Sequence, residues 1–153
     1  MSAVFLDSNV LVEGFVSRWG LNRAVLALCA ARIHQLYLAE IVRREVERTL
    51  LLLTSEYASA PRRLSQQILS DYDKFLLLAK PRMIPEPDAA EVAAAGHLIR
   101  HQNDVPVLVS AIKSAPDWVI SNNVEHFNQR VAARTGLRIV TPYQFFATIH
   151  ANA

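Results

Sequence analysis

The sequence predicts an α/β fold: a single-domain, three-layer α/β/α arrangement with a mainly parallel central sheet. Short apolar runs rich in β-branched and aromatic residues alternate with longer amphipathic segments along the chain. Such alternation gives βαβ units, whose helices cover both faces of a parallel sheet. The 153 residues, 52% apolar and 20% charged, are typical of one globular domain, which we expect to span residues 1–153.

The first half of the chain supplies two of the predicted strands. A strand over Ala3–Leu6 is followed by a helix from about Asn9 to Arg32. A second strand over Gln35–Leu38 leads into a helix over Ala39–Leu53, where apolar residues recur at helical spacing. A further helix over Pro61–Lys80 begins with a proline, which suits the first turn of a helix.

The second half continues the alternation. Strands are predicted over Arg82–Ile84, Trp118–Ser121 and Arg138–Val140. Helices are predicted over Asp88–His101, Asp104–Ser114, Asn123–Arg134 and Pro142–His150. The first of these helices has Asp88 as its N-cap and Glu91 three residues later, an acidic variant of the capping box.

Composition narrows the function classes without selecting one. A formal net charge of +2 neither indicates nor excludes nucleic-acid binding, because a local stripe of cations matters more than the sum. Neither GxGxxG nor GxxxxGK followed by Ser or Thr occurs, which argues against a dinucleotide or NTP site. Cys29 is the only cysteine, no basic leader precedes the first apolar run, and no apolar run approaches the ~20 residues of a membrane span. We therefore expect a soluble, cytoplasmic protein without a membrane segment.

The first predicted strand ends in a carboxylate, in the stretch VFLDSNVLV. Ligands of open parallel sheets bind beyond the carboxyl ends of the strands. Asp7 is therefore predicted to point at the functional site.

Glu45 lies at the border of the apolar stripe of its predicted helix, between Ile41 and Thr49. A carboxylate in that position is costly unless it is paired or bound to a metal. Two interpretations stay open: a boundary residue that forms a salt bridge with Arg44 or Arg48, or an inward-facing metal ligand.

Asp104 and Asn123 each precede a predicted helix. Both can be explained as N-caps, and both can equally belong to a site. Asn123 closes the stretch WVISNN, which repeats the order of apolar strand, small polar residues and helix seen around Asp7.

Together, Asp7, Glu45, Asp104 and Asn123 would converge on the carboxyl edge of one parallel sheet. Ionised acids held close together repel, and a hard divalent cation such as Mg²⁺ or Mn²⁺ relieves that repulsion through oxygen ligands. Such a site suits hydrolysis of a phosphodiester, because the metal activates water and neutralises charge on the phosphorus.

These motifs resemble those of PIN-domain ribonucleases over nearly the whole chain. VFLDSNVLV resembles the opening strand of the family, and LYLAEIVRREVERTL resembles its second strand and helix with an acid at Glu45. NDVPVLVSAI resembles its Asp-led helix, DWVISNNVEHF its strand with a terminal polar triplet, and GLRIVTPYQFF its closing strand and helix. The five motifs follow in the family order.

The resemblance implies a metal-dependent RNA endonuclease, often the toxin of a VapBC-type toxin–antitoxin pair. It implies that Asp7, Glu45 and Asp104 bind the metal and that Asn123 completes the catalytic set. Some members have a fourth acid where this chain has Asn123, which implies one negative charge fewer and a single tightly held metal. In that frame Asn9 and Ser121 either orient the carboxylates or cap the backbone.

An RNA substrate, a possible antitoxin protein and a homodimer are the expected partners. RNA needs a basic rim, and His126 is a further candidate for contact with the site. The candidate arginines are Arg18, Arg23, Arg43, Arg44, Arg48, Arg62 and Arg63. The candidate stacking aromatics are Trp19, Tyr57 and Tyr72. Leu76, Leu77 and Leu78 either form a dimer face or antitoxin groove or pack in the core.

Three rival functions start from the same acid. A haloacid-dehalogenase-like phosphatase needs a second acid where Asn9 stands, and a receiver domain needs adjacent acids that the Asp7-Ser8 pair does not supply. A catalytically weak or inactive PIN-like scaffold that binds protein or RNA stays open as the alternative, because Asn123 replaces an acid.

Overall fold

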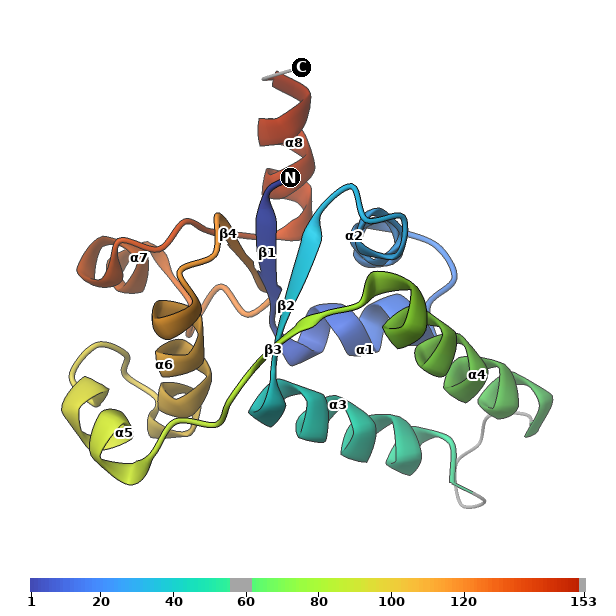
Figure 1. Cartoon of the computed structure of the whole chain (residues 1–153), viewed down its shortest axis with the longest axis horizontal. Helices are drawn as coiled ribbons and strands as arrows, with labels where there is room; N and C mark the ends of the chain where they lie inside the picture. The colour runs from blue at the N-terminus through green and yellow to red at the C-terminus, as the bar shows by residue number, and fades with distance from the viewer. Residues whose placement is uncertain (56–61, 152–153) are drawn as a thin grey trace.

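The computed structural model describes residues 1–55 and 62–151, and its centre is a sheet of five parallel strands (Figure 1). The strand order is β3-β2-β1-β4-β5. The strands are β1 (Ala3–Leu6), β2 (Gln35–Ala39), β3 (Arg82–Ile84), β4 (Trp118–Ile120) and β5 (Ile139–Val140). The predicted α/β class and the parallel sheet are confirmed.

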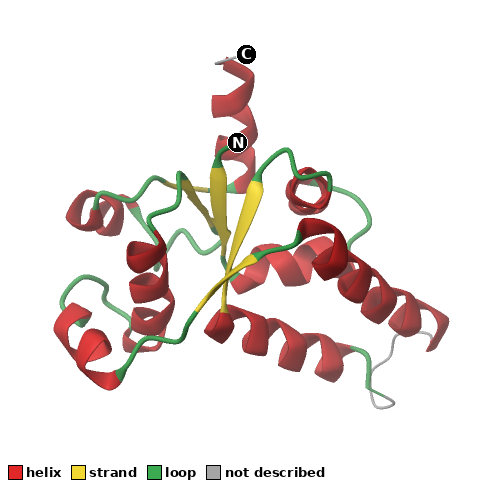
Figure 2. Cartoon of the chain, viewed as in Figure 1, coloured by secondary structure: helices red, strands yellow, loops and turns green. Residues whose placement is uncertain are grey.

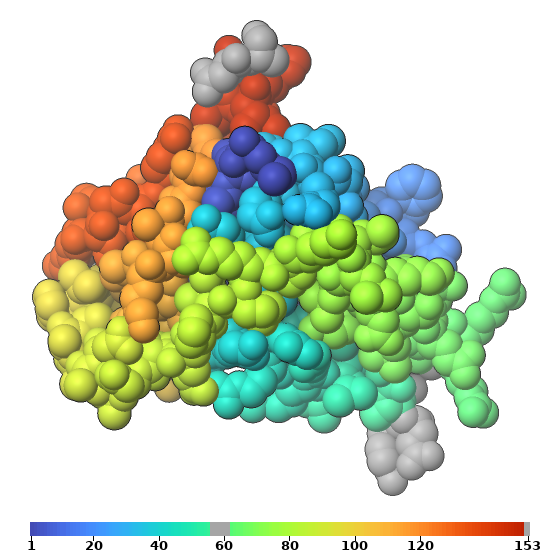
Figure 3. Space-filling view, in the orientation of Figure 1, coloured from blue at the N-terminus to red at the C-terminus, as the bar shows by residue number. Residues whose placement is uncertain are grey.

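Helices surround the strands on all sides of the view (Figure 2). The helices are α1 (Ser8–Val16), α2 (Leu21–Ala30), α3 (Glu40–Leu53), α4 (Arg62–Ala79), α5 (Ala89–Ala95), α6 (Val105–Ser114), α7 (Gln129–Thr135) and α8 (Pro142–Ala151). In Figure 1, α1, α2 and α4 lie on one side of the sheet and α6 and α7 on the other. The yellow-green segment that carries β3 and α5 crosses the front of the molecule between these two groups (Figure 3).

Strand β1 occupies the middle of the sheet. Val4 is in register with Leu36 of β2 on one side and with Trp118 of β4 on the other. Every residue of β1 is buried, as expected for a parallel strand covered on both faces. At its amino end the Ala3 N–H donates to Asp117 Oδ2 at 2.6 Å, which ties β1 to the turn before β4. Because β1 pairs in parallel with β2 and β4, its carboxyl end lies between the carboxyl ends of those two strands.

The predicted helix from Asn9 to Arg32 is two helices. Helix α1 ends at Val16, and Gly20 begins α2 with a φ of 104°, which a residue with a side chain rarely adopts. The two helices then pack closely, since a Cβ on Gly14 would lie 2.5 Å from Leu26 Cδ1. Apolar residues recur on both sides of the break between Val16 and Leu21, so the sequence pattern predicted one continuous helix.

Other boundaries also differ from prediction. The helix predicted over Asp88–His101 ends at Ala95, although its capping box of Asp88 and Glu91 is present. The 3-10 turn η1 (Gln102–Asp104) then leads into α6. The helix predicted over Asn123–Arg134 begins at Gln129 instead, because Asn128 is its N-cap and accepts from the Val131 N–H at 3.1 Å.

Within residues 1–55 and 62–151, no helix is both long and apolar enough to cross a membrane. The predicted first turn at Pro61 and the predicted stacking residue Tyr57 lie outside the described residues.

Candidate active site

Asp7 lies directly after β1 and is only 6% exposed. Its backbone N–H donates to the Ile120 carbonyl at 3.0 Å, which extends the pairing of β1 with β4 by one residue. Its Oδ1 accepts from the Ser8 N–H at 2.8 Å, and its Oδ2 accepts from Ser121 Oγ at 2.7 Å and from Asn9 Nδ2 at 3.1 Å. Both carboxylate oxygens are therefore held by donors that follow the two central strands.

A second set of hydrogen bonds joins the ends of β1 and β4. The Asn122 N–H donates to Asn9 Oδ1 at 2.9 Å, and the Asn123 N–H donates to Ser121 Oγ at 3.0 Å. Asn9 and Ser121 thus contact both the Asp7 carboxylate and the backbone beyond β4. The Asp7 side chain has a single, fixed orientation as a result.

Burial raises the pKa of Asp7, and the nearby Asp104 carboxylate raises it further. The hydrogen bonds from Ser121, Ser8 and Asn9 oppose this rise because they stabilise the ionised form. The electrostatic effect of Asp104 on Asp7 means that these two acids lie close enough for their charges to interact.

Asp104 stands at the start of α6 but makes no capping hydrogen bond there. Its Oδ2 lies 2.6 Å from His126 Nδ1 instead, and the His126 ring stacks on the His101 ring with 3.5 Å between centroids. Both contacting atoms are shut off from solvent, and neither forms a hydrogen bond of good geometry with any described residue. A buried carboxylate oxygen in this state is suited to accept a cation.

Glu45 lies on the second turn of α3 and is half-buried. The predicted salt bridge with Arg44 or Arg48 is wrong for the described residues, where Arg44 pairs with Glu86 and Glu45 forms no ion pair. Among the residues that the structure describes, the Glu45 carboxylate therefore has no ion-pair partner.

The three predicted metal ligands are not gathered into one cluster. Asp7 and Asp104 interact, but no group of three His, Cys, Asp or Glu side chains in residues 1–55 and 62–151 is arranged to hold a metal ion.

Asn123 does not cap a helix, because α7 begins later and has Asn128 as its N-cap. Its Oδ1 accepts from the His126 N–H at 3.3 Å. This bond closes the turn that follows β4 and carries the His126 ring toward Asp104. The proximity of His126 to the site, suggested by its place in the sequence, is therefore seen in the structure.

Three arginines of the predicted RNA rim are neutralised by ion pairs. These pairs are Arg23–Asp71, Arg43–Glu47 and Arg44–Glu86. Tyr72 is buried and donates its hydroxyl to Glu47 Oε1 at 3.1 Å, so it is a core residue that does not offer its ring to a base. Trp19, in contrast, is 85% exposed.

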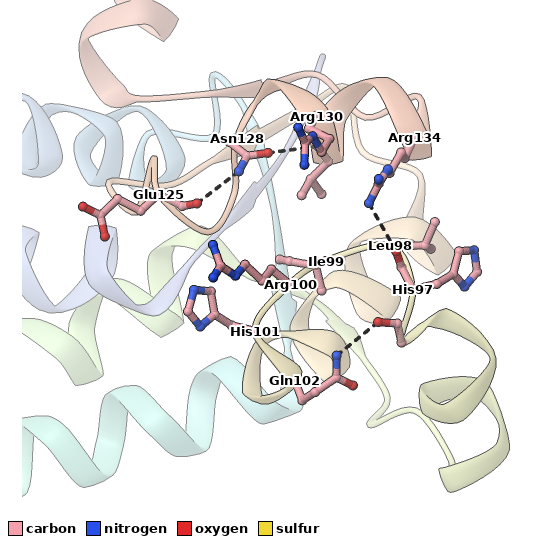
Figure 4. A pocket seen from close by; sticks show the side chains of 12 residues that line it. His97, Leu98, Ile99, Arg100, His101, Gln102, Glu125, Asn128, Arg130 and Arg134 are labelled. Atoms are coloured by element: carbon pink, nitrogen blue, oxygen red, sulfur yellow. Dashed lines mark hydrogen bonds between the residues drawn. The ribbon is translucent and has the colours of Figure 1, made fainter.

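The sequence analysis missed a cationic pocket beside Asp104. It lies between the turn after α5 and the start of α7, and has a volume of about 570 Å³ (Figure 4). Its positive charge comes from Arg100, Arg130 and Arg134, and the rings of His97 and His101 also line it. The stretch HLIRH places His97 and His101 four residues apart, with Arg100 directly before the second histidine. This concentration of basic residues is a signal that could have marked the segment.

Comparison with known proteins identifies the family. A sequence profile of the PIN domain matches residues 3–125. A comparison with curated proteins found no significant match.

Solved structures with the same fold include two complexes. One is VapBC2 from Rickettsia felis bound to a DNA fragment from its promoter, with 20% identity, a TM-score of 0.62, and coverage of 91% of this chain and 98% of that chain. Another is FitAcB from Neisseria gonorrhoeae, with 17% identity, a TM-score of 0.63, and coverage of 92% and 98%. With its sequence matched over most of its length and its fold shared with these structures, the chain belongs to the PIN domain family.

Proposed function

We propose that this protein is a divalent-metal-dependent endoribonuclease that hydrolyses RNA phosphodiester bonds, as the toxin of a VapBC-type toxin–antitoxin pair. PIN domains are generally nucleases. The observation that carries the proposal is the Asp7 carboxylate, buried at the centre of the sheet edge, fixed by three donors and raised in pKa in part by Asp104. A buried, oriented pair of acids at the edge where parallel sheets bind ligands is the arrangement that metal-assisted hydrolysis needs.

The residues present fit a hard divalent cation. The groups around Asp7 offer oxygen atoms, and Asp104 Oδ2 is buried without a well-formed hydrogen bond, which suits Mg²⁺ or Mn²⁺. Asp7 and Asp104 would hold the ion, and Glu45 would be the third acid. When bound, the ion would polarise the phosphodiester and lower the pKa of water.

The chain's own residues keep these acids in place. Ser121 and Asn9 fix the orientation of Asp7, and Asn123 holds the turn that brings His126 against Asp104. Glu45 is uncommitted within the described residues, and we assign it to completing the site or orienting the attacking water.

Cleavage of a mixed single-stranded RNA pool in Mn²⁺ tests the proposal. Asp7→Asn keeps the shape of the side chain and should abolish cleavage, and EDTA should abolish cleavage by the wild-type protein. Asn122→Ala is a matched control, because Asn122 lies at the same edge while its exposed side chain donates a hydrogen bond to Asn22 and forms none with Asp7 or Asp104. Cleavage by Asp7→Asn at the wild-type rate would overturn the assignment.

The alternative is a PIN-like scaffold of weak or no catalytic activity. The absence of a three-ligand group in the described residues favours it. Thermal unfolding separates the two: a nuclease should be stabilised by millimolar Mn²⁺ through its acids, whereas a scaffold should show no stabilisation and no RNA hydrolysis.

We also propose an antitoxin as partner. A groove of about 270 Å³ between α2 and α4 is lined by Phe15, Leu26, Phe75 and Leu78, among others. The exposed side chains of Leu77 and Leu78 support a protein ligand there, and the similarity to VapBC2 and FitAcB supports an antitoxin as the kind of partner. A homodimer and a cytoplasmic location belong to the same proposal, and light scattering of the purified protein checks the first.

A further inference from the structure

We propose that the cationic pocket defined by His97, Arg100, His101, Arg130 and Arg134 binds a backbone phosphate of the RNA strand, next to the bond that is cut. This inference rests on the proposed function, since it assigns a substrate contact to the same nuclease. The inference can be tested by measuring RNA affinity, which does not depend on cleavage.

The pocket is built by two segments that the fold brings face to face. Residues 96–102 form one wall, and Asn128 with one face of α7 (Arg130, Val131 and Arg134) forms the other. In Figure 4, Arg100 points into the space between the two walls, with Arg130 across from it. At one end Arg134 Nη1 donates to the His97 carbonyl at 3.3 Å, which fixes the distance between the walls.

The charge of this pocket is not neutralised by the protein. None of the ion pairs in the described residues includes Arg100, Arg130 or Arg134. Other exposed arginines are also without an ion pair there, but this pocket brings three of them together. Their guanidinium groups match the geometry of a phosphate.

One acid lines the pocket without cancelling its charge. The carboxylate of Glu125 forms no ion pair with described residues and is turned away from Arg100 in the close view (Figure 4). Its backbone carbonyl accepts from Asn128 Nδ2 at 3.1 Å, so the residue serves the turn before α7.

The pocket is continuous with the acidic site. His101 lines the pocket, its ring stacks on His126 at 3.5 Å, and His126 Nδ1 lies 2.6 Å from Asp104 Oδ2. The His126 ring thus lies between Asp104 and the pocket residue His101. We place the phosphate next to the cleaved bond on the arginine side of this ring.

RNA is favoured over an acidic protein segment by this position. A phosphate chain that must pass the carboxylates needs compensating cations beside them, because phosphate contacts supply most of the affinity for nucleic acid. An acidic peptide would gain nothing from the nearby Asp7 and Asp104. The rings of His97 and His101 additionally offer flat surfaces to unstacked bases.

The experiment measures binding of a fluorescent single-stranded RNA to protein that carries Asp7→Asn, so that cleavage does not interfere. Adding Arg100→Gln and Arg130→Gln should weaken binding about tenfold or more. The slope of log K against log salt concentration should fall by about 0.7 for each phosphate that the protein no longer neutralises. Adding Arg100→Lys and Arg130→Lys should restore part of the salt slope but less of the affinity, because lysine keeps the charge and lacks the bidentate geometry.

Arg32→Gln is the matched control, because Arg32 is exposed at the amino end of the sheet, before β2. It should bind RNA like its parent. Equal affinity and equal salt slope for the pocket variants and this control would overturn the proposal. Poly-glutamate serves as a second probe, an acidic peptide. The proposal would also be overturned if the pocket variants lost affinity for poly-glutamate but bound RNA as tightly as their parent, because that result would indicate an acidic protein ligand.

The failure of the two proposals can be told apart. If wild-type protein cleaves RNA in Mn²⁺ but the pocket variants bind it normally, the nuclease stands and the pocket assignment falls. If no cleavage occurs but the pocket variants lose RNA binding, the pocket assignment stands and the nuclease falls. In cleaving protein, Arg100→Gln with Arg130→Gln should raise KM and leave kcat nearly unchanged.

Discussion

His126 and Asp104 form a buried contact, with His126 Nδ1 only 2.6 Å from Asp104 Oδ2. The imidazole covers a carboxylate oxygen that a cation would otherwise take. One face of the His126 ring is also stacked on the His101 ring. His126 therefore contacts both the Asp104 carboxylate and a residue that lines the cationic pocket.

Removing that ring should uncover Asp104 Oδ2 to solvent and remove the packing against His101. We expect His126→Ala to lower the free energy of unfolding by about 1 kcal/mol, a common cost of losing a packed side chain. Mn²⁺ should restore more stability to this variant than it adds to the wild-type protein. Thermal unfolding with and without Mn²⁺ checks this, with His150→Ala on the exposed face of α8 as control. An unchanged response to Mn²⁺ would count against competition for the carboxylate.

Asp7→Asn should lose activity without losing stability. Burial is the largest cause of the raised pKa of Asp7. Because the folded-state pKa lies above the ordinary 3.8, the folded state favours the protonated form, and that stability is lost as the pH rises. At neutral pH the neutral amide should therefore unfold at the same or a higher temperature than the metal-free wild type. Cleavage should fall more than about 100-fold. A clearly lower unfolding temperature would show that the hydrogen bonds outweigh the cost of burial.

His34 should make stability depend on pH with the opposite sign. Burial, and then the charge of the N-terminal amine, lower its pKa, and its Nδ1 lies 2.6 Å from Ser2 Oγ. The folded state therefore binds fewer protons, so the contribution is present above the ordinary value of 6.5 and is lost as the pH falls below it. The unfolding temperature of the wild type relative to His34→Gln should fall between about pH 7.5 and pH 5.5. A constant difference over that range would refute the assignment.

Cys29 should be inert in the folded protein. Its side chain is fully buried, and burial raises the pKa of the thiol to about 12, so almost no thiolate is present at pH 8. Labelling by a thiol-specific disulfide reagent should proceed only as fast as the protein unfolds, and denaturant should accelerate it. Immediate labelling of one thiol under native conditions would contradict the buried position.

Gly14 should tolerate no side chain unless Leu26 is reduced. A Cβ at this position would lie 2.5 Å from Leu26 Cδ1. Gly14→Ala should therefore cost about 1–3 kcal/mol through overpacking. Gly14→Ala combined with Leu26→Ala should be less destabilised than the two separate costs would give, because the clash is gone. Urea unfolding of the four proteins measures this coupling, and strict additivity would exclude the clash.

The strands and the place of the site were predictable because they depend on local sequence. All five strands are short β-prone runs, and Asp7 follows the first of them at the edge where parallel sheets bind ligands. Helix boundaries were less predictable. The break before Gly20 depends on one φ angle that apolar periodicity does not reveal, and either Asn123 or Asn128 could have capped α7 by composition alone.

The side-chain partners could not be predicted because they depend on tertiary packing. The ion pair of Arg44 with Glu86 joins α3 to the segment after β3, so the sequence of α3 alone suggested a wrong partner for Glu45. The pocket of Arg100 and Arg130 likewise forms only where the turn after α5 meets α7. Three of the seven predicted rim arginines form ion pairs, and Arg100, Arg130 and Arg134 of the pocket lie in segments outside the predicted motifs.

The bond from Ser121 Oγ to Asp7 Oδ2 spans 114 positions of the chain. The carboxylate and the hydroxyl that orients it therefore belong to two distant segments, which meet only when β4 pairs with β1. A fragment that stops before β4 would carry Asp7 without the Ser121 hydroxyl and without the Ile120 carbonyl that its backbone N–H pairs with. Under the proposed function, such a fragment should not cleave RNA.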